Sequence, residues 1–109
     1  APILIVKRDG TRQQYDRNKL KNGIVRSCEK RPISMAQIDD IVARIEKSLY
    51  NSLEEEVTSK KIGDLVMEEL KQIDDVAYIR FAAVYRQFKD SQTFFDEMKK
   101  MFETKEGKK

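Results

Sequence analysis

Residues 6–20 read VKRDGTRQQYDRNKL, and this stretch decides how the fold begins. Residues 3–8 and 11–15 are strand-like, and Asp9-Gly10 between them predicts a β-hairpin with a type I′ turn, which needs positive φ at both central positions. Asp16 is a candidate N-cap, because its carboxylate can accept hydrogen bonds from the free backbone N–H groups of a helix. The stretch therefore predicts a hairpin that leads directly into a helix.

The start of this helix is basic, although a helix dipole favours anions at that end. Arg17, Lys19 and Lys21 lie in the first turns, and Lys7 and Arg8 lie just upstream at the hairpin tip. Free N–H groups with surplus cations suit a bound phosphate. We therefore hypothesise a polyphosphate site built by the hairpin and the helix behind it. The alternative is that these charges only solvate an exposed face.

The composition excludes several classes of site. The chain has 109 residues, which fits one domain with a core that needs no disulfide. It contains no histidine and a single cysteine, which excludes the usual zinc sites and the Ser-His-Asp and Cys-His catalytic sets. Cys28 is predicted to be a small buried hydrophobe rather than a reactive thiol. We therefore expect no catalytic residue, no metal ligand and no enzyme activity.

Charge and hydropathy limit which partners and which cellular location the sequence favours. The net charge of +3 is too small and too mixed with acidic residues to indicate nucleic-acid binding by itself. The chain shows no signal peptide and no long apolar run, so neither secretion nor a membrane span is expected. The use of a single cysteine is compatible with a reducing compartment. These observations favour a cytoplasmic location.

Start and stop signals predict the remaining elements. The first helix should run from Asp16 to about residue 30, because Arg31 precedes a proline. The later signals are a capping box at Ser34 and Gln37, a short strand at 56–58, a helix capped by Thr58 or Ser59 with inner residues Ile62, Leu65, Val66, Leu70 and Ile73, a helix capped by Asp74 or Asp75, and a fifth helix from Ser91.

Apolar periodicity predicts how these elements pack. Residues 76–88 are apolar around nearly the whole helix circumference, which is typical of a central helix. The predicted fold class is α+β, with a four-helix bundle capped by a small two- or three-stranded sheet and a C-terminal fifth helix outside it. Residues 91–103, which carry a stripe from Phe94 to Phe102, form this helix and a candidate oligomer contact. Residues 104–109 are expected to be a disordered tail.

Several motifs resemble a known family. Val6-Lys7-Arg8-Asp9-Gly10, followed by Asp16 and Lys19-Leu20, resembles the opening of the ATP-cone, an allosteric nucleotide-binding module, and the resemblance assigns this domain to residues 1–90. The stretches CEKRPIS at 28–34, IGDLVME at 62–68 and VAYIRFAAVYR at 76–86 are similar to the NrdR family, the bacterial repressors of ribonucleotide reductase genes.

The resemblance implies a function. Repressors of this family join an N-terminal zinc ribbon that binds DNA to an ATP-cone that senses ATP and dATP, and the nucleotide state controls oligomerisation and operator binding. This chain lacks the cysteines of the ribbon, so zinc is expected only in the missing N-terminal region and DNA binding only in the full-length protein. The expected ligands are ATP or dATP with Mg²⁺, and the expected partners are further copies of the chain.

Two other functions are alternatives to this one. The chain could be the regulatory ATP-cone of a ribonucleotide reductase catalytic subunit, but a charged end soon after Phe102 argues against a following catalytic domain. A basic nucleic-acid-binding module would predict tight, salt-sensitive DNA binding. Few aromatic residues accompany the basic ones, which disfavours that reading.

The resemblance also implies roles for individual residues. Lys7, Arg8 and Lys19 would face the phosphates, lysine as a point charge and arginine as a planar fork. The residues expected near the base, ribose or adenosine are Gln13, Tyr15, Asp16, Leu20, Ser59 and Ile62, with Tyr85 and Arg86 as further candidates.

Some of these assignments have rival explanations. Leu20, Ile62 and Tyr85 would equally serve as core residues, and Tyr15 as an ordinary strand residue. Gln13-Gln14 stands where family members commonly show Glu-Pro. The lost carboxylate would remove an acceptor for a sugar hydroxyl or the adenine amine, which bears on discrimination between ATP and dATP.

Overall fold

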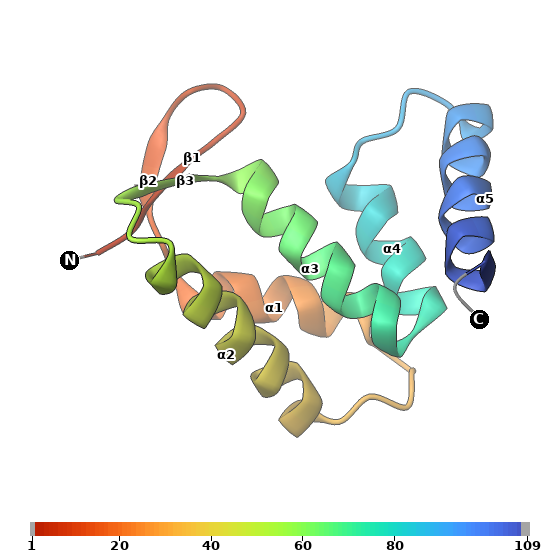
Figure 1. Cartoon of the computed structure of the whole chain (residues 1–109), viewed down its shortest axis with the longest axis horizontal. Coiled ribbons are helices and arrows are strands. Elements are labelled where there is room, and N and C mark those ends of the chain that lie inside the picture. Colours follow the sequence, from red (N-terminus) through yellow and green to blue (C-terminus); the bar gives the residue numbers. More distant parts are fainter. Residues whose placement is uncertain (1, 108–109) are drawn as a thin grey trace.

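The computed structural model describes residues 2–107, and the α+β prediction is confirmed in this range. A small sheet lies at one end, α1, α2 and α3 extend from it, and α4 and α5 follow on the far side (Figure 1). The elements are β1 (Leu4–Val6), β2 (Arg12–Gln14), α1 (Arg17–Ser27), α2 (Met35–Asn51), β3 (Glu56–Thr58), α3 (Ser59–Ile73), α4 (Asp75–Tyr85) and α5 (Ser91–Gly107).

The sheet holds three strands in the order β2-β1-β3. β1 pairs antiparallel with β2 and parallel with β3, so Ile5 lies opposite both Gln13 and Val57. Alternation along β1 buries Ile3 and Ile5 and turns Leu4 outward. The predicted third strand at 56–58 is confirmed, and it leads without a loop into α3.

The hairpin turn differs from the prediction. Lys7 N–H donates to the Thr11 carbonyl at 2.8 Å, and Gly10 N–H donates to the Lys7 carbonyl at 2.9 Å. Within the loop 8–10, only Gly10 has positive φ, at 87°. The type I′ assignment was therefore wrong, and the loop has three residues with a left-handed glycine last. The Asp9 carboxylate fixes it by accepting from Thr11 N–H at 2.9 Å.

The first helix ends earlier than residue 30, which corrects the predicted boundary. α1 stops at Ser27, and Lys30 adopts a left-handed φ of 64°. Arg80 of α4 donates to the carbonyls of Ser27 and Glu29, at 3.4 and 2.5 Å. These carbonyls are paired across the fold, so the helix does not need to continue to satisfy them.

Local caps begin the other helices as the sequence indicates. The capping box of Ser34 and Gln37 is present at the start of α2. Of the alternatives left open, Thr58 caps α3 and Asp74 caps α4. Asp74 also accepts from Arg31 Nε at 3.0 and 3.1 Å, which joins the loop after α1 to α4.

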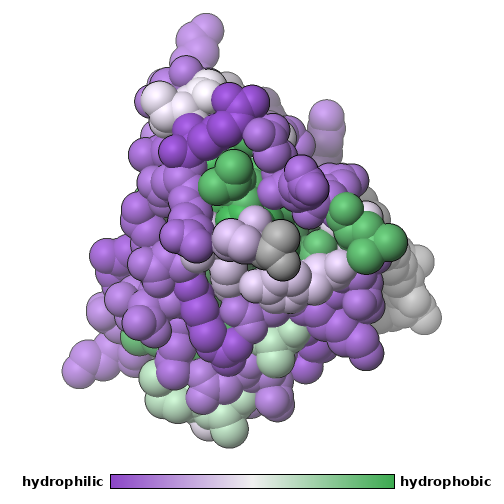
Figure 2. All heavy atoms as spheres, turned by 90° about the vertical axis from the view of Figure 1, so that its left-hand side faces the viewer, coloured by the Kyte–Doolittle hydropathy of each residue, from purple (hydrophilic) through white to green (hydrophobic). Residues whose placement is uncertain are grey.

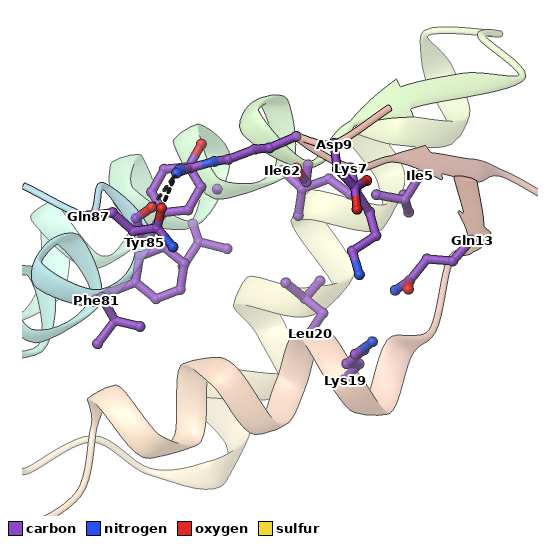
Figure 3. Close-up of a pocket in the computed structure, with 15 residues that line it drawn as sticks. Ile5, Lys7, Asp9, Gln13, Lys19, Leu20, Ile62, Phe81, Tyr85 and Gln87 are labelled. Carbon is purple, nitrogen blue, oxygen red and sulfur yellow. Dashed lines mark hydrogen bonds between the residues drawn. The ribbon is translucent and has the colours of Figure 1, made fainter. Parts of the chain in front are cut away.

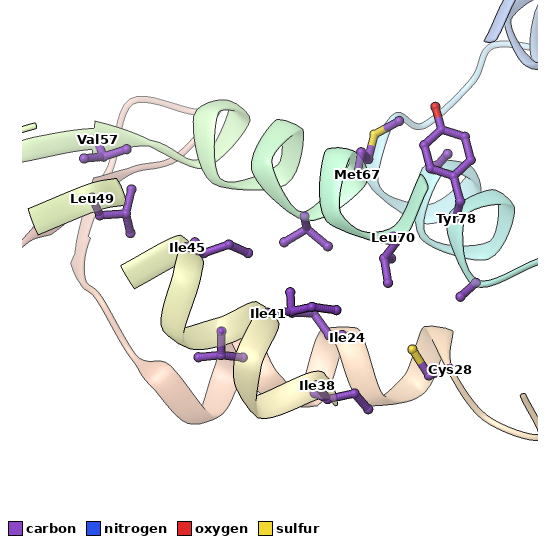
Figure 4. Packing of buried hydrophobic residues seen from close by; sticks show 14 of the residues in the cluster. Ile24, Cys28, Ile38, Ile41, Ile45, Leu49, Val57, Met67, Leu70 and Tyr78 are labelled. Atoms are coloured by element: carbon purple, nitrogen blue, oxygen red, sulfur yellow. The ribbon is translucent and has the colours of Figure 1, made fainter. Parts of the chain in front are cut away.

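One hydrophobic core joins the sheet to the bundle (Figure 4). α1 packs against α2 and α4, and α3 also packs against α2 and α4. Cys28 is buried as predicted, and burial raises the pKa of its thiol. Ile73 was assigned to the inner face of α3 but is 37% exposed, because it is the last residue of that helix.

α4 is not the central helix that its composition indicated. Ala77, Tyr78 and Ala82 are buried, but Val84 is 78% exposed. The prediction was wrong because Val84 lies on the surface and Phe81 is only partly buried against the core, where it also lines two cavities.

The fifth helix packs outside the bundle, as expected. Met98 is buried, whereas Phe95 is 66% exposed. α5 continues to Gly107, so residues 104–107 are helical instead of belonging to a disordered tail, and 108 and 109 lie outside the described residues. None of the helices in the described range is long and apolar enough to cross a membrane.

Candidate functional site

A cavity of about 680 Å³ opens between the hairpin, α1, α3 and the end of α4 (Figure 3). This volume falls within the range of small-molecule sites. A smaller cavity of about 180 Å³ adjoins it and shares Ile5, Gln13, Lys19, Leu20, Ser59 and Ile62 with it. The face of the molecule at the sheet end is mostly hydrophilic, with a small group of hydrophobic side chains set among the polar ones (Figure 2).

The structure brings most of the candidate residues together. Those lining the larger cavity are Lys7, Arg8, Gln13, Lys19, Leu20, Ser59, Ile62 and Tyr85, and the smaller cavity adds Tyr15 and Asp16. Arg86 lines neither. Its guanidinium pairs with Glu97 of α5 at 2.9 Å and lies 5.5 Å from the ring centroid of Phe88. Arg86 thus contacts α5 and lies outside the candidate site.

The basic residues of α1 separate into two groups. Arg17 pairs with Glu46, and Lys21 pairs with Asp39 at 2.8 Å, both on α2. No ion pair to Lys7 or Lys19 is formed by the side chains that the structure describes. Lys7 just after β1, Gln13 of β2 and Lys19 of α1 point into the same part of the cavity (Figure 3). Positive charge therefore gathers at this end, where Lys7, Arg8 and Lys19 line the larger cavity together with the carboxylate of Asp9.

At the N-terminus of α1, the Asp16 cap occupies two of the N–H groups that the phosphate hypothesis assumed to be free. The Asp16 carboxylate accepts from Asn18 N–H at 2.9 Å and from Lys19 N–H at 3.3 Å. Because the cap already uses these two donors, they do not add to phosphate binding. Side-chain cations remain as the means of holding an anion here.

The middle of the cavity is apolar. Leu20 of α1 and Ile62 of α3 face each other across it (Figure 3). Both are half-buried and also pack against the core, so they serve the core and the cavity together. Ser59, Gly63 and Val66 join Ile62 on one face of α3, at helical spacing. The arrangement offers two apolar walls to a flat ring.

Tyr15 contributes its ring to the smaller cavity, while its hydroxyl points elsewhere. The hydroxyl donates to Glu46 Oε2 at 2.8 Å, on α2. Burial, and then the hydrogen bond to Glu46, raise the pKa of Tyr15, so the phenol stays neutral at physiological pH.

Arg8 reaches across the mouth of the cavity to the end of α4. Its guanidinium donates to Gln87 Oε1 at 3.0 Å and to the Tyr85 carbonyl at 2.5 Å, and it lies 5.3 Å from the Tyr85 ring centroid. The Tyr85 hydroxyl donates to the Lys60 carbonyl at 2.7 Å. Sequence reasoning missed Gln87, because nothing local marks a contact between residues 79 positions apart.

Metal ligands are not concentrated anywhere in the described part of the chain. No group of three or more His, Cys, Asp or Glu side chains there is arranged to hold a metal ion. Among the described residues that line the larger cavity, Asp9 is the one acidic residue.

Comparison with known proteins identifies a domain family and a family of whole proteins. Residues 3–91 match the ATP cone domain. "Transcriptional repressor NrdR" of Caldicellulosiruptor bescii is 52% identical over 95% of this chain and 68% of the relative. The proteins of that name from Acetivibrio thermocellus and Thermoanaerobacter pseudethanolicus are 56% and 51% identical, over 95% and 99% of this chain and 69% and 68% of the relatives.

These relatives are named as repressors and not as enzymes, in agreement with the function expected from the sequence. The ATP-cone match covers the hairpin and all the elements that line the cavity, and it implies nucleotide binding. The chain belongs to the NrdR family of transcriptional repressors, and its residues 3–91 form an ATP-cone domain.

Proposed function

We propose that this repressor domain binds an adenine nucleoside triphosphate, ATP or dATP, in the larger cavity. The observation that carries the proposal is the convergence of Lys7 and Lys19 beside the apolar walls of Leu20 and Ile62. Among the described side chains, neither lysine forms an ion pair. A ligand that fits must be strongly anionic at one end and flat and apolar at the other. A nucleoside triphosphate has both properties.

The phosphates lie at the end formed by Lys7 and Lys19. Lysine ammonium groups act there as point charges, and Arg8 at the hairpin tip adds a planar fork for phosphate oxygens. Mg²⁺ enters with the nucleotide, because triphosphate oxygens are ligands that this ion prefers.

The nucleoside lies toward the smaller cavity. Leu20 and Ile62 contact the faces of the purine, and the ring of Tyr15 closes the inner end. Gln13 and Ser59 supply the polar groups for a sugar hydroxyl or the base edge, since both line the two cavities. Asp16 lies at the edge of this region while it caps α1.

The nucleotide state controls oligomerisation, and thereby DNA binding by a zinc ribbon outside this chain. Such control requires ATP and dATP to bind two assembly states with unequal affinity. α5 is the proposed contact between copies, and the repressor acts in the cytoplasm. A regulatory cone of a ribonucleotide reductase catalytic subunit is not favoured, because the relatives described above carry the repressor name.

Calorimetric titration with Mg-ATP and Mg-dATP tests the site. Lys7→Ala and Lys19→Ala should each weaken both affinities at least tenfold, which corresponds to about 1.4 kcal/mol. Lys21→Ala is the matched control, because Lys21 lies on the same helix but pairs with Asp39 and lines neither cavity. Unchanged affinities in both folded cavity variants would contradict the proposed site.

A further inference from the structure

We propose that Arg8 couples the phosphate end of the cavity to α5, because a bound triphosphate withdraws its guanidinium from Tyr85 and Gln87. The inference rests on the proposed function and adds a route by which the ligand reaches a distant helix. It is carried by the contacts of Arg8 and of the turn between α4 and α5.

Arg8 caps the C-terminus of α4. Tyr85 is the last residue of α4, and the final carbonyl groups of a helix lack intrahelical partners. Arg8 supplies a cation at this end, where the helix dipole favours one, through the bonds to the Tyr85 carbonyl and the Gln87 side chain dashed in Figure 3. The hairpin tip therefore holds the segment that follows α4.

The turn after α4 is held from its other side by α5. Gln87 adopts a left-handed φ of 50°, which a non-glycine residue rarely takes without support. Next to it, Arg86 donates to Glu97 of α5 at 3.0 Å, and the Phe88 and Phe94 rings pack edge to face at 5.1 Å. A change at Gln87 is thus passed to α5 through an ion pair and an aromatic contact.

A triphosphate competes well for Arg8. The two acceptors that Arg8 now uses, a side-chain amide and a backbone carbonyl, are both uncharged. Hydrogen bonds between a guanidinium and an ionised phosphate are roughly twice as strong as neutral ones. Lys7, the neighbouring residue, already points to the phosphate end (Figure 3), so Arg8 lies within reach of the same ligand. Binding therefore releases the turn and loosens the start of α5.

Hydrogen–deuterium exchange on the whole chain tests this coupling. Saturating Mg-ATP should speed amide exchange in residues 86–94 by roughly threefold or more. Adenosine, which lacks phosphates, should leave that segment unchanged at concentrations that occupy the nucleoside region. Slower or unchanged exchange in residues 86–94 with bound Mg-ATP would overturn the inference.

Gln87→Ala gives an independent test, because this substitution is expected to strengthen Mg-ATP binding. The variant removes an acceptor that competes with phosphate, so it should bind Mg-ATP roughly threefold more tightly and show fast exchange in 86–94 before ligand is added. Gln92→Ala is the matched control, since its amide donates to Asp96 within α5 and does not contact Arg8. Weaker or unchanged ATP affinity in Gln87→Ala would refute competition.

The two proposals fail in different ways. If calorimetry detects no binding of ATP or dATP to the unmodified chain, the proposed function is wrong. If ATP binds but residues 86–94 keep their exchange rates, only the coupling through Arg8 is wrong.

Discussion

The ring of Tyr85 occupies the space that a Cβ atom at Gly63 would need, so α4 approaches α3 directly over this glycine. The ring is held there by stacking on Phe81 at 5.5 Å and by its hydroxyl bond to the Lys60 carbonyl at 2.7 Å. Because Gly63 and Tyr85 both line the larger cavity, this contact shapes the candidate site.

Gly63→Ala should therefore displace Tyr85. We expect the free energy of unfolding to fall by about 1–3 kcal/mol, as for other overpacked sites, and Mg-ATP affinity to fall with it. Urea denaturation and calorimetric titration measure the two effects.

Gly23→Ala is the matched control for this substitution. Gly23 also lies inside a helix, but a Cβ there meets no atom within 4 Å. The variant should be more stable by up to about 1 kcal/mol, because alanine favours the helix over glycine. Equal effects of the two substitutions would contradict the packing described for Tyr85.

Asp74 should make stability depend on pH. Burial raises the pKa of its carboxyl, but hydrogen bonds from Ala77 and Arg31 outweigh this and hold the pKa below the ordinary 3.8. Its contribution to stability is therefore complete above the ordinary value and is lost as pH falls through the lower folded value. Asp74→Asn, which keeps an N-cap residue, should cost about 1–3 kcal/mol at pH 7.

Urea denaturation of wild type and Asp74→Asn, repeated at falling pH, measures this loss. The difference between the two proteins should stay constant above about pH 5 and shrink below the ordinary pKa of 3.8. A difference that stays the same in strong acid would show that the charge of Asp74 is not responsible.

Tyr15 separates the roles of a ring and a hydroxyl. Its hydroxyl donates to Glu46, while the residue lines the smaller cavity. Tyr15→Phe should lower stability by about 1 kcal/mol and leave Mg-ATP affinity within twofold, because only a hydrogen bond to α2 is lost. Tyr15→Ala should weaken ATP binding as well. A large loss of affinity in Tyr15→Phe would place the hydroxyl on the ligand.

Phe95 tests the proposed contact through α5. Its side chain is 66% exposed, while Met98 on the same helix is buried. Phe95→Asp should reduce the molar mass measured by light scattering with nucleotide present, and should change the stability of the single chain by less than about 0.5 kcal/mol. Leu53→Asp is the control, because Leu53 is an exposed apolar residue away from α5. Equal masses for Phe95→Asp and wild type would exclude this contact.

Local signals predicted much of the fold. Ser34 with Gln37, and Asp16 at the start of α1, cap their helices through side-chain bonds that span three residues or fewer. The end of α1 could not be predicted in this way. The carbonyls of Ser27 and Glu29 accept hydrogen bonds from Arg80, which lies on α4, far away in the sequence. The hairpin was predicted but its turn type was not, because the Asp9 side chain fixes the turn and only Gly10 is left-handed there.

Most residues that line the two cavities could be predicted from the sequence. Which of the basic residues form ion pairs could not. Lys19 and Lys21 look alike in the sequence. In the structure Lys21 forms an ion pair with Asp39 on α2, whereas Lys19 lines the cavity. The bridge from Arg8 to Gln87 depends on where α4 ends relative to the hairpin, and no periodicity encodes that distance.

A two-dimensional amide NMR titration of the unmodified chain with Mg-ATP tests the central claim most directly. The claim predicts saturable shift changes concentrated in residues 5–20, 59–66 and 81–87, the segments that line the two cavities. Spectra that do not change, or changes concentrated along α2 instead, would contradict it.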